Sequence, residues 1–383
     1  MLRFDLNAGS VQLGCDPELF IRCEGKIVPS EEVIPKDGIV VDYLSKIIRD
    51  GIQLEFNPMP YYCRANFGNH MRSLFYHLRN HVDAKGKTNN KKYEISFEQV
   101  IKLTDEDIQT INPEAMRLGC RPSLNAYGDF RMAVSDLYPY RSGGGHIHLG
   151  GFNRFGSGRS FDPDTAPILA KILDIILGNT CVLIDRDPDQ VERRKVYGRA
   201  GEYRIQPHGF EYRVLSNFWF RAYPLFSFCM ATARTGVQIF NNVEASDYVL
   251  NLVDQAKVIQ AINENDYSLA YENYLIVKEF FKDHIKCSDS YGLTYAIHKE
   301  GIDSTDSAFD LFIRKIKESG LQYWFHEDPL THWLNLPEGH VCGWETFIDT
   351  VVQKEIFKIK REICIEEMKN ENVLPNLQGN IQV

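Results

Sequence analysis

Residues 14–20 read GCDPELF, and within them two carboxylates, Asp16 and Glu18, are separated by a single residue. They belong to residues 11–23, a stretch of alternating apolar residues that predicts a β-strand. Side chains two positions apart on a strand project from the same face of a sheet. The segment therefore predicts a strand that presents two acids on one face and packs Cys15 and Leu19 on the other.

Polar residues with the same spacing occur in four further strand-like segments. They are Gln53 and Glu55 in GIQLEFNP, His146 and His148 in SGGGHIHLGG, Glu202 and Arg204 in GEYRIQP, and Glu211 and Arg213 in FEYRVLSN. A single pair of this kind is more typical of an ordinary solvated sheet face. A solvated face usually draws on lysine, threonine, serine and glutamine, whereas these pairs consist mainly of Asp, Glu, His and Arg and contain no Lys. The five pairs together predict one sheet face with a chemical role.

Such a face needs cations, because two carboxylates about 4 Å apart repel each other by roughly 4 kcal/mol even at an effective dielectric constant near 20. Mg2+ or Mn2+ suits carboxylate oxygens with an occasional imidazole. The arginines suit a polyanion such as a phosphoryl group in transfer. We therefore predict a metal and nucleotide site on this face. Zinc, suggested by the HxH of His146 and His148, is the alternative, although a third soft ligand at a suitable spacing is missing.

Three other features of the sequence have simpler interpretations. Residues 142–145 (SGGG) have the composition of a phosphate cradle, but no lysine follows as in a P-loop, so we predict a glycine turn that enters the strand at His146. Arg193 and Arg194 are expected in a solvated loop. His208 and Glu202 suit structural hydrogen bonds as well as they suit the site. The spacing supports no Ser-His-Asp or Cys-His combination.

The composition is that of a folded globular protein. At 383 residues, 44% of them hydrophobic, the chain is long enough for one large domain or two ordinary ones. Its net charge of −9 argues against non-specific binding of nucleic acid. Nine cysteines without a CxxC pair fit neither a zinc ribbon nor a disulfide framework. Because no signal peptide or apolar stretch of membrane-spanning length is evident, we expect a soluble cytoplasmic protein.

The chain changes near residue 245 from a mixed part to a helical part. In the mixed part we predict strands over residues 11–23 and 51–57, helices over residues 70–82, 164–185 (with Asp164 as N-cap) and 223–242, and a polar loop over residues 83–92. In the helical part we predict helices over residues 268–284, 308–319 and 344–369. The change could mark a second domain, but we favour helices that pack on the sheet.

In their order along the chain, these motifs resemble those of glutamine synthetase and its amide-ligase relatives. GCDPELF resembles the first metal strand, IQLEF the GQxE strand, SGGGHIHLGG the SGMHxH strand, and FEYR the final ExR strand. Arg199 and Arg204, followed by Ile-Gln-Pro, resemble the NRSAxxRIP segment. More narrowly, residues 11–220 resemble the phage and bacterial carboxylate–amine ligases called amidoligase type 2. Each motif is short, and it is the order of the five that is specific.

The resemblance implies an α+β fold with a glutamine synthetase-like curved antiparallel sheet, helices on one face and a helical C-terminal region. The catalytic domain would comprise residues 1–245, with an insertion at residues 84–140. Residues 246–383 would form the helical C-terminal region, which we expect on the same domain. The insertion and the C-terminal helices are where we expect substrate choice to lie, because loops inserted on a rigid scaffold usually carry specificity.

The resemblance also implies an ATP-dependent ligase that joins a carboxylate to an amine in an amide or peptide-like bond through an acyl-phosphate intermediate. The implied ligands of Mg2+, or of Mn2+, are Asp16, Glu18, Glu55, His146 and Glu211. The implied contacts of ATP are His148, Arg204 and Arg213. Arg199, Arg204 and Arg213 would stabilise the charge that develops in the reaction. Such a mechanism needs no enzyme nucleophile.

The sequence departs from the glutamine synthetase pattern in three respects. The pattern has a further metal acid eight residues before the glutamate of the GQxE strand, and here that position is Ile47. Either one metal site is incomplete, or Asp50 or Asp42 compensates. The first acid is Asp16 where the pattern has Glu, which gives it a shorter reach. The loop with the ammonium-binding aspartate has no counterpart, which puts glutamine synthesis itself in doubt.

Two other functions remain open from the sequence alone. A guanidino kinase-like phosphotransferase also surrounds ATP with arginines borne on a sheet, and a phage structural or partner-binding protein could retain the fold without catalysis. Retained acids count against the latter, because unneeded buried charge destabilises a protein. For the ligase we expect small-molecule or peptide carboxylates and amines as partners, no membrane or nucleic acid, and either a monomer or an oligomer. A phage-encoded chain would work in the cytoplasm of its host.

Overall fold

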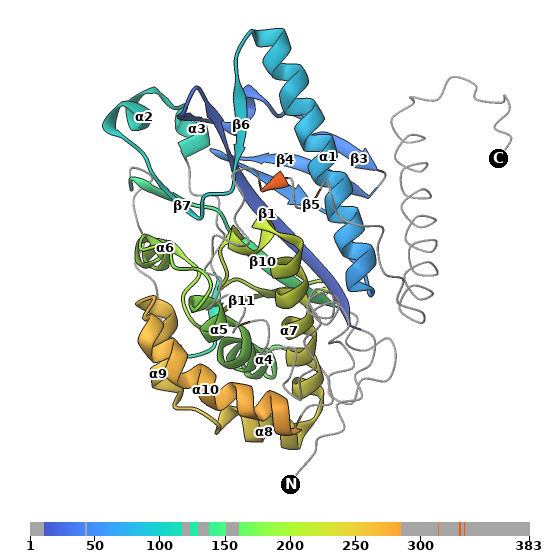
Figure 1. The fold of residues 1–383 in the computed structure, drawn as a ribbon, viewed down its shortest axis with the longest axis vertical. Coiled ribbons are helices and arrows are strands. Elements are labelled where there is room, and N and C mark those ends of the chain that lie inside the picture. The colour runs from blue at the N-terminus through green and yellow to red at the C-terminus, as the bar shows by residue number, and fades with distance from the viewer. Residues whose placement is uncertain are drawn as a thin grey trace, which may run out of the picture.

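The computed structural model describes residues 11–42, 44–116, 123–128, 138–150 and 161–284, together with Ile313, Pro329, Leu330 and Trp333. These residues form a mixed α+β structure around a ten-stranded antiparallel sheet. The predicted fold class is thereby confirmed at the level of a large antiparallel sheet with helices packed against it (Figure 1).

Strand β1 (Gln12–Cys23) is the centre of this sheet, and it confirms the strand predicted over residues 11–23. Its N-terminal half pairs with β10, its middle with β5, and its C-terminal end with β2 (Lys26–Val28) and β6 (Tyr93–Ser96). The order of the main sheet is β3 (Ile39–Asp42), β4 (Ser45–Asp50), β5 (Gln53–Asn57), β1, β10 (Gly145–Gly150), β12 (Gly209–Tyr212), β11 (Glu202–Gln206) and β8 (Leu124–Asn125). A separate pair is formed by β7 (Val100–Lys102) and β9 (Tyr140–Ser142).

The alternation of residues along β1 explains which face of the sheet is covered. Leu13, Cys15 and Leu19 are buried, and the Cys15 thiol lies 3.9 Å from the sulfur of Met71 in helix α1 (Arg64–Asn89). Because side chains alternate, the carboxylates between them project from the opposite face. The apolar half of the strand thus packs on the helices and leaves the acids on the site face.

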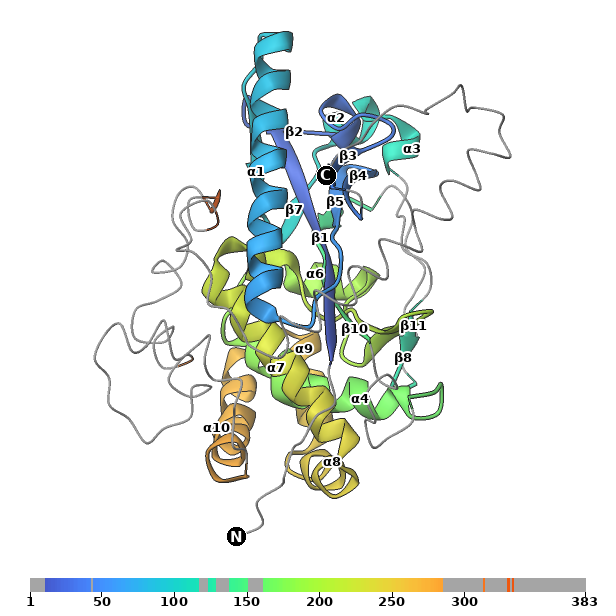
Figure 2. The same ribbon diagram turned by 90° about the vertical axis from the view of Figure 1, so that its right-hand side faces the viewer.

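Two long helices, α1 and α7 (Tyr223–Asn241), cover the apolar face on the same side of β1 (Figure 2). They approach closely at Gly68, where an added Cβ atom would lie 2.3 Å from the ring of Tyr223. The short helices α2 (Asp105–Thr110) and α3 (Pro113–Met116) lie on the other side of β1, where Phe20 joins a second apolar cluster. The expectation of helices on one face alone is therefore wrong at this end of β1, because Phe20 makes that face apolar again.

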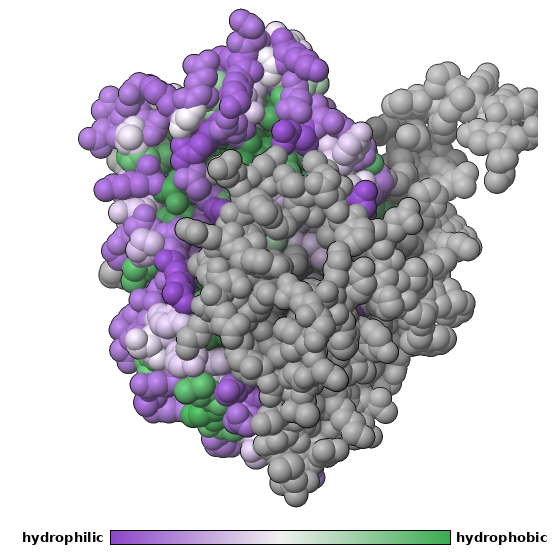
Figure 3. Space-filling model, viewed as in Figure 1, coloured by the Kyte–Doolittle hydropathy of each residue, from purple (hydrophilic) through white to green (hydrophobic). Residues whose placement is uncertain are grey.

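Helix α1 is longer than predicted and includes most of the segment expected to be a loop over residues 83–92. The stretch after Asp83 contains alanine and lysine, which are good helix formers, and Asp83 pairs with Arg79 one turn earlier at 3.2 Å. The helix ends at Asn90, whose positive φ of 51° and backbone bond to Gly86 form a left-handed cap. The polar composition therefore reflects an exposed helical face, and Figure 3 shows a hydrophilic surface around this helix.

The helix predicted over residues 164–185 begins and continues differently. Thr165, not Asp164, precedes helix α4 (Ala166–Leu173), which passes through a π-helical turn (Asp174–Gly178) into α5 (Asn179–Val182). The π turn contains Asp174, a buried acid that accepts a hydrogen bond from Tyr212 Oη at 2.6 Å. Burial raises the pKa of Asp174 to about 7.

Two of the remaining predicted helices are confirmed, and the structure adds others that were not individually predicted. Helices α7 and α10 (Tyr267–His284) confirm those predicted over residues 223–242 and 268–284. Those predicted over residues 308–319 and 344–369 lie outside the described residues, apart from Ile313. The others are α6 (Gln190–Val196), α8 (Val243–Leu250), α9 (Gln255–Asn263) and two short 3-10 helices, η1 (Ser30–Glu32) and η3 (Asn217–Arg221). Nowhere in the described part of the chain does a helix combine the length and apolar character needed to cross a bilayer.

Trp333, from the C-terminal region, fills the space between α1 and α7. Its ring centroid lies 4.9 Å from that of Phe75 and 5.4 Å from that of Phe226, and its indole nitrogen donates to the carbonyl of Phe220 at 2.6 Å. The side chain is fully buried. At this point the C-terminal region is part of the same core as the helices that cover the sheet.

We expect Trp333→Ala to lower the free energy of unfolding by about 3–5 kcal/mol, because it empties a buried aromatic site. Trp333→Phe, which keeps one ring, should cost clearly less. The measurement is urea denaturation of the full chain. Leu275→Ala on α10, where the side chain is 40% exposed, is the control and should cost less than about 1 kcal/mol. Equal costs for Trp333→Ala and Leu275→Ala would contradict the packing described.

Candidate functional site

Strand register brings the predicted acids and histidine of β1 and its neighbours together. Asp16 lies opposite His146 of β10, and Glu18 lies opposite Glu55 of β5. Directly opposed residues of antiparallel strands have Cβ atoms about 4.5–5.5 Å apart. Each acid of β1 therefore contacts a different neighbouring strand, so the two acids serve two separate groups of side chains.

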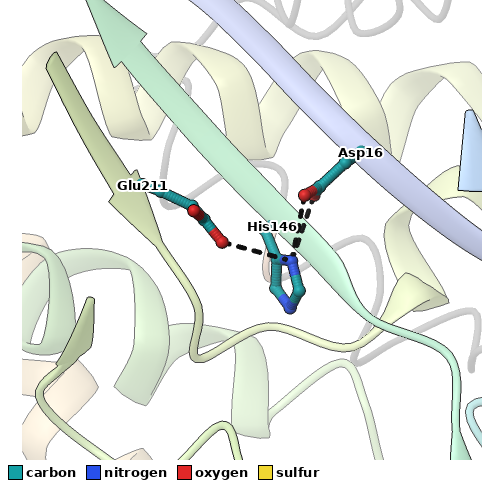
Figure 4. A group of neighbouring side chains, drawn as sticks. All are labelled: Asp16, His146 and Glu211. Atoms are coloured by element: carbon teal, nitrogen blue, oxygen red, sulfur yellow. Dashed lines mark hydrogen bonds and ion pairs between the residues drawn. The ribbon is translucent and has the colours of Figure 1, made fainter. Parts of the chain in front are cut away.

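The first group consists of Asp16, His146 and Glu211, from the adjacent strands β1, β10 and β12 (Figure 4). His146 Nδ1 lies 3.1 Å from Asp16 Oδ1 and 3.6 Å from Glu211 Oε1. His146 and Glu211 are buried. One donor atom from each residue lies within 4.8 Å of the other two. The imidazole nitrogen thus lies between two carboxylates, a position that requires a shared proton or a metal ion.

The second group consists of Glu18, Asp50 and Glu55, whose donor atoms also lie within 4.8 Å of one another. Asp50 ends β4 and lies opposite Gln53 in the tight connection to β5. Ile47, at the position of the missing acid, is fully buried in the core. Asp50, one of the two acids that the sequence offered as alternatives, therefore completes this group.

The other alternative, Asp42, lies in a different environment. Its Oδ2 is 3.7 Å from His70 Nδ1, and His70 Nε2 is 2.8 Å from Ser45 Oγ. This order of Asp, His and Ser resembles a nucleophilic triad. However, Ser45 is completely buried and its Oγ accepts the N–H of Met59 at 3.0 Å, so a substrate has no access to it. We interpret these residues as a structural hydrogen-bonding chain.

Burial and mutual repulsion make the second group costly in the absence of a cation. They raise the pKa of Glu55 to about 10, with burial as the largest cause and the charges of Asp16, Glu18 and Asp50 adding to it. The same causes raise the pKa of Asp50 to about 6. Neighbouring carboxylates disfavour one another's ionised form unless a positive charge lies among them. The second group therefore has the electrostatics of a cation site.

Glu211 connects the first group to the predicted arginines. It lies opposite Arg204 in the pairing of β11 and β12, and Arg204 Nη1 lies 3.4 Å from Glu211 Oε1. Arg213 Nε is 3.1 Å from the same oxygen, and Gln206 donates to Glu211 Oε2 at 2.5 Å. Burial opposes ionisation, but His146 and other neighbours hold the pKa of Glu211 below its usual value. Arg199, the third predicted arginine, is half-buried in the loop between α6 and β11.

His148 forms a chain of contacts from the first group toward the surface. Its Nε2 lies 3.2 Å from Asp16 Oδ2, and its Nδ1 lies 3.0 Å from Nε2 of the exposed His208. Burial would lower the pKa of His148, but the Asp16 carboxylate raises it above its usual value. Burial also opposes ionisation of Asp16, yet His146 and His148 hold the pKa of Asp16 well below its usual value. His208 is therefore a partner of the site.

Glu18 is held by hydrogen bonds from outside both groups. Its Oε2 accepts the backbone N–H of Gly144 at 2.6 Å, the hydroxyl of Tyr197 at 3.0 Å and the amide of Gln53 at 3.4 Å. A Cβ atom on Gly144 would lie 2.8 Å from His146 Nε2 and 3.0 Å from Glu18 Oε2, so only glycine fits there. The glycine segment is thus a close turn between β9 and β10, as predicted, and one of its N–H groups binds a site carboxylate.

Arg193 and Arg194 contradict the prediction of a solvated loop. Both are buried on α6, where Arg193 donates to the carbonyls of Val214 and Leu215 at 2.7 Å and Arg194 to that of Val214 at 2.5 Å. The carbonyls after β12 thus receive guanidinium donors, and that of Leu215 also accepts the backbone N–H of Gly145 at 3.1 Å. Glu202 is also structural, since its carboxylate accepts the N–H of Gly198 at 3.0 Å.

The donors of the two groups fit magnesium or manganese better than zinc. Five of the six ligating side chains are carboxylates, and the sixth is an imidazole. Hard divalent cations prefer oxygen ligands, whereas structural zinc prefers Cys and His. It is His146 Nδ1 that faces the Asp16 and Glu211 carboxylates (Figure 4), so this nitrogen would be the imidazole donor to a cation there. Two divalent cations would balance much of the negative charge.

We expect Mg2+ to stabilise the protein, and Glu55→Gln to abolish that effect. Without metal, the free energy of unfolding should fall by at most about 1.4 kcal/mol per pH unit as the pH rises from about 4.5 to 10. The reason is that Glu55 ionises readily in this range only in the unfolded chain. Melting temperatures with EDTA at pH 5–8 should fall less steeply in Glu55→Gln. Added Mg2+ should then raise the melting temperature of the native chain but not that of the variant. Glu272→Gln, 66% exposed, is the control, and a Mg2+ effect retained in Glu55→Gln would contradict the assignment.

Comparison with known protein families finds a match for part of the chain. Residues 130–256 match the model of a family described as phage phiEco32-like COOH.NH2 ligase-type 2. The matched segment includes β10, β11 and β12, and with them His146, Arg204, Glu211 and Arg213. No curated protein matches the chain. Over residues 130–256 the match supports the resemblance to carboxylate–amine ligases of type 2 that the motifs indicate.

Proposed function

We propose that the protein is an ATP-dependent carboxylate–amine ligase that forms an amide or peptide-like bond through an acyl phosphate. The family match supports joining of a carboxylate to an amine. The observation that carries the proposal is the contact of Glu211 with both His146 and the arginines Arg204 and Arg213. It places a metal-type donor group beside two cationic side chains, the combination that phosphoryl transfer from ATP requires.

In this proposal the two donor groups hold two Mg2+ ions, or Mn2+ ions. The first would be held by Asp16, His146 and Glu211, and the second by Glu18, Asp50 and Glu55. When bound, the ions supply positive charge that neutralises the phosphates of ATP. The sheet keeps the ligands in place without them, because every ligand except Asp50 lies inside a paired strand and His146, Glu18 and Glu211 are buried.

The arginines supply the remaining charge stabilisation. Arg204 and Arg213 lie on the edge of the first group away from β1, and Arg213 also donates to Ser123 Oγ at 2.8 Å. A guanidinium group offers several N–H donors in a fixed plane, a geometry that suits the binding of a phosphoryl oxygen. The substrate carboxylate would attack the γ-phosphorus and release ADP, and the amine would then displace phosphate. Arg199 would contact the substrate from its loop.

The reaction places few other demands on the chain. Since the carboxylate substrate is itself the nucleophile, an enzyme nucleophile is unnecessary, in agreement with the inaccessible Ser45. The work of the site is to bring reactants together and to stabilise charge.

The reaction can be tested by trapping the acyl phosphate. With MgATP, a panel of amino acids, polyamines and peptides, and hydroxylamine as a reactive amine, we expect hydroxamate and phosphate to form in equal amounts. Glu211→Gln should lower the rate at least about 100-fold, because it removes a ligand and the partner of both arginines. Glu106→Gln on α2, 71% exposed, should not alter the rate.

Two results would overturn this function. If calorimetry detects no MgATP binding at millimolar concentrations, the site does not bind the nucleotide. Phosphate transfer to a guanidine acceptor without hydroxamate formation would make the protein a phosphotransferase instead of a ligase.

A further inference from the structure

Tyr197 lies at the end of α6 and reaches into the site from outside the sheet. It is the first residue after the helix, has an extended backbone and is buried. Its hydroxyl lies 3.0 Å from Glu18 Oε2 and 3.1 Å from the carbonyl of Ser142. The other donors to this carboxylate oxygen, Gly144 and Gln53, belong to strands or their turn. Tyr197 is therefore a contact through which α6 acts on the carboxylate of Glu18, whereas Asn217 of η3 donates to the Glu18 backbone carbonyl at 2.7 Å.

The ring of Tyr197 is itself fixed on several sides. The guanidinium group of Arg193 lies 4.7 Å from the ring centroid, and that of Arg213 lies 5.6 Å from it. The ring of His146 meets it edge-on at 5.7 Å. Guanidinium groups are attracted to aromatic faces, and the attraction is stronger where water is excluded. These contacts, together with the hydrogen bond to Glu18, therefore oppose rotation of the Tyr197 ring.

The backbone around Tyr197 is built for this arrangement. Gly198 has a φ of +79°, and a Cβ atom there would lie 2.2 Å from Arg193 Nη1. The same guanidinium group is anchored on the carbonyls of Val214 and Leu215. Glycine at position 198 thus lets Arg193 lie against both the turn and the aromatic ring.

We propose that Tyr197 is a positioning residue for Glu18. Its hydroxyl binds one oxygen of the carboxylate and leaves other lone pairs for the cation shared with Asp50 and Glu55. A carboxylate offers about four acceptor positions, and the three donors to Oε2 do not exhaust them. Residues that orient a metal ligand affect metal affinity nearly as strongly as the ligand does. The inference rests on the proposed function, because it assumes that the second group binds a divalent cation.

The test is a titration of the full chain with Mn2+, in which unbound Mn2+ is measured by its electron paramagnetic resonance signal. We expect the native chain to bind two Mn2+ ions, Asp16→Asn to lose one and Glu18→Gln to lose the other. Tyr197→Phe keeps the ring and its contacts but removes the hydroxyl. Tyr197→Phe should lower the affinity for the ion that Glu18→Gln loses by about 10–100-fold, and it should leave the affinity for the other ion unchanged.

Tyr138→Phe is the matched control. The Tyr138 hydroxyl donates to Glu192 of α6 at 2.5 Å, so this variant loosens the same helix without touching Glu18. It should bind both ions like the native chain, and thermal unfolding should show that both variants are folded.

Three outcomes would overturn the inference. If Tyr197→Phe binds both ions normally, or loses both equally, the hydroxyl does not position Glu18, although the proposed function stands. If Tyr138→Phe weakens the same ion to the same extent, general support from α6 is responsible. If the native chain binds no Mn2+, the proposed metal site fails together with this inference.

Discussion

Repulsion among buried carboxylates is the constraint on which the arrangement of this protein depends. Glu18 and Glu55 are directly opposed across β1 and β5, and Asp50 is added at the end of the neighbouring hairpin. Like charges directly opposed on a sheet are destabilising. The repulsion is concentrated at the central strand β1, where pairing on both sides leaves the side chains little freedom to move apart. A chain without use for these acids would gain stability by losing them, which argues against a purely structural role.

The surroundings of the site limit that cost with fixed dipoles and cations. Gly144, Tyr197 and Gln53 donate to Glu18, and Arg213 and Gln206 contact Glu211. These donors come from a turn, a helix end and neighbouring strands, so the carboxylates of the site are held by elements that lie far apart in the sequence. Such preorganised donors need little rearrangement when charge develops in a reaction.

Much of the site could be predicted because its residues lie on strands. A spacing of two residues is sufficient to place Asp16 with Glu18, or His146 with His148, on one face. The spacing does not reveal register, so the separation of Asp16 and Glu18 into two groups required the pairing of β1 with β10 and β5. The choice of Asp50 over Asp42 depended on the geometry of a hairpin.

Side chains that act from helices could not be placed in this way. Arg193 and Arg194 have the composition of a surface segment, and their burial is explained by the carbonyls after β12, to which both guanidinium groups donate. Tyr197 begins the segment YGRAGEYR, but the resemblance implied roles only for Arg199 and Arg204 of that segment. The end of α1 was misjudged for the related reason that an exposed helical face and a loop have similar polar compositions.

The position of Trp333 has a consequence for biosynthesis. Every strand of the sheet and both long helices precede this residue along the chain, whereas the aromatic surface of Phe75 and Phe226 is covered only when Trp333 packs between them. During synthesis, the sheet and these two helices are therefore made before the residue that completes the aromatic contact between them. The nascent chain carries an uncovered apolar seam between Phe75 and Phe226 until Trp333 has been synthesised.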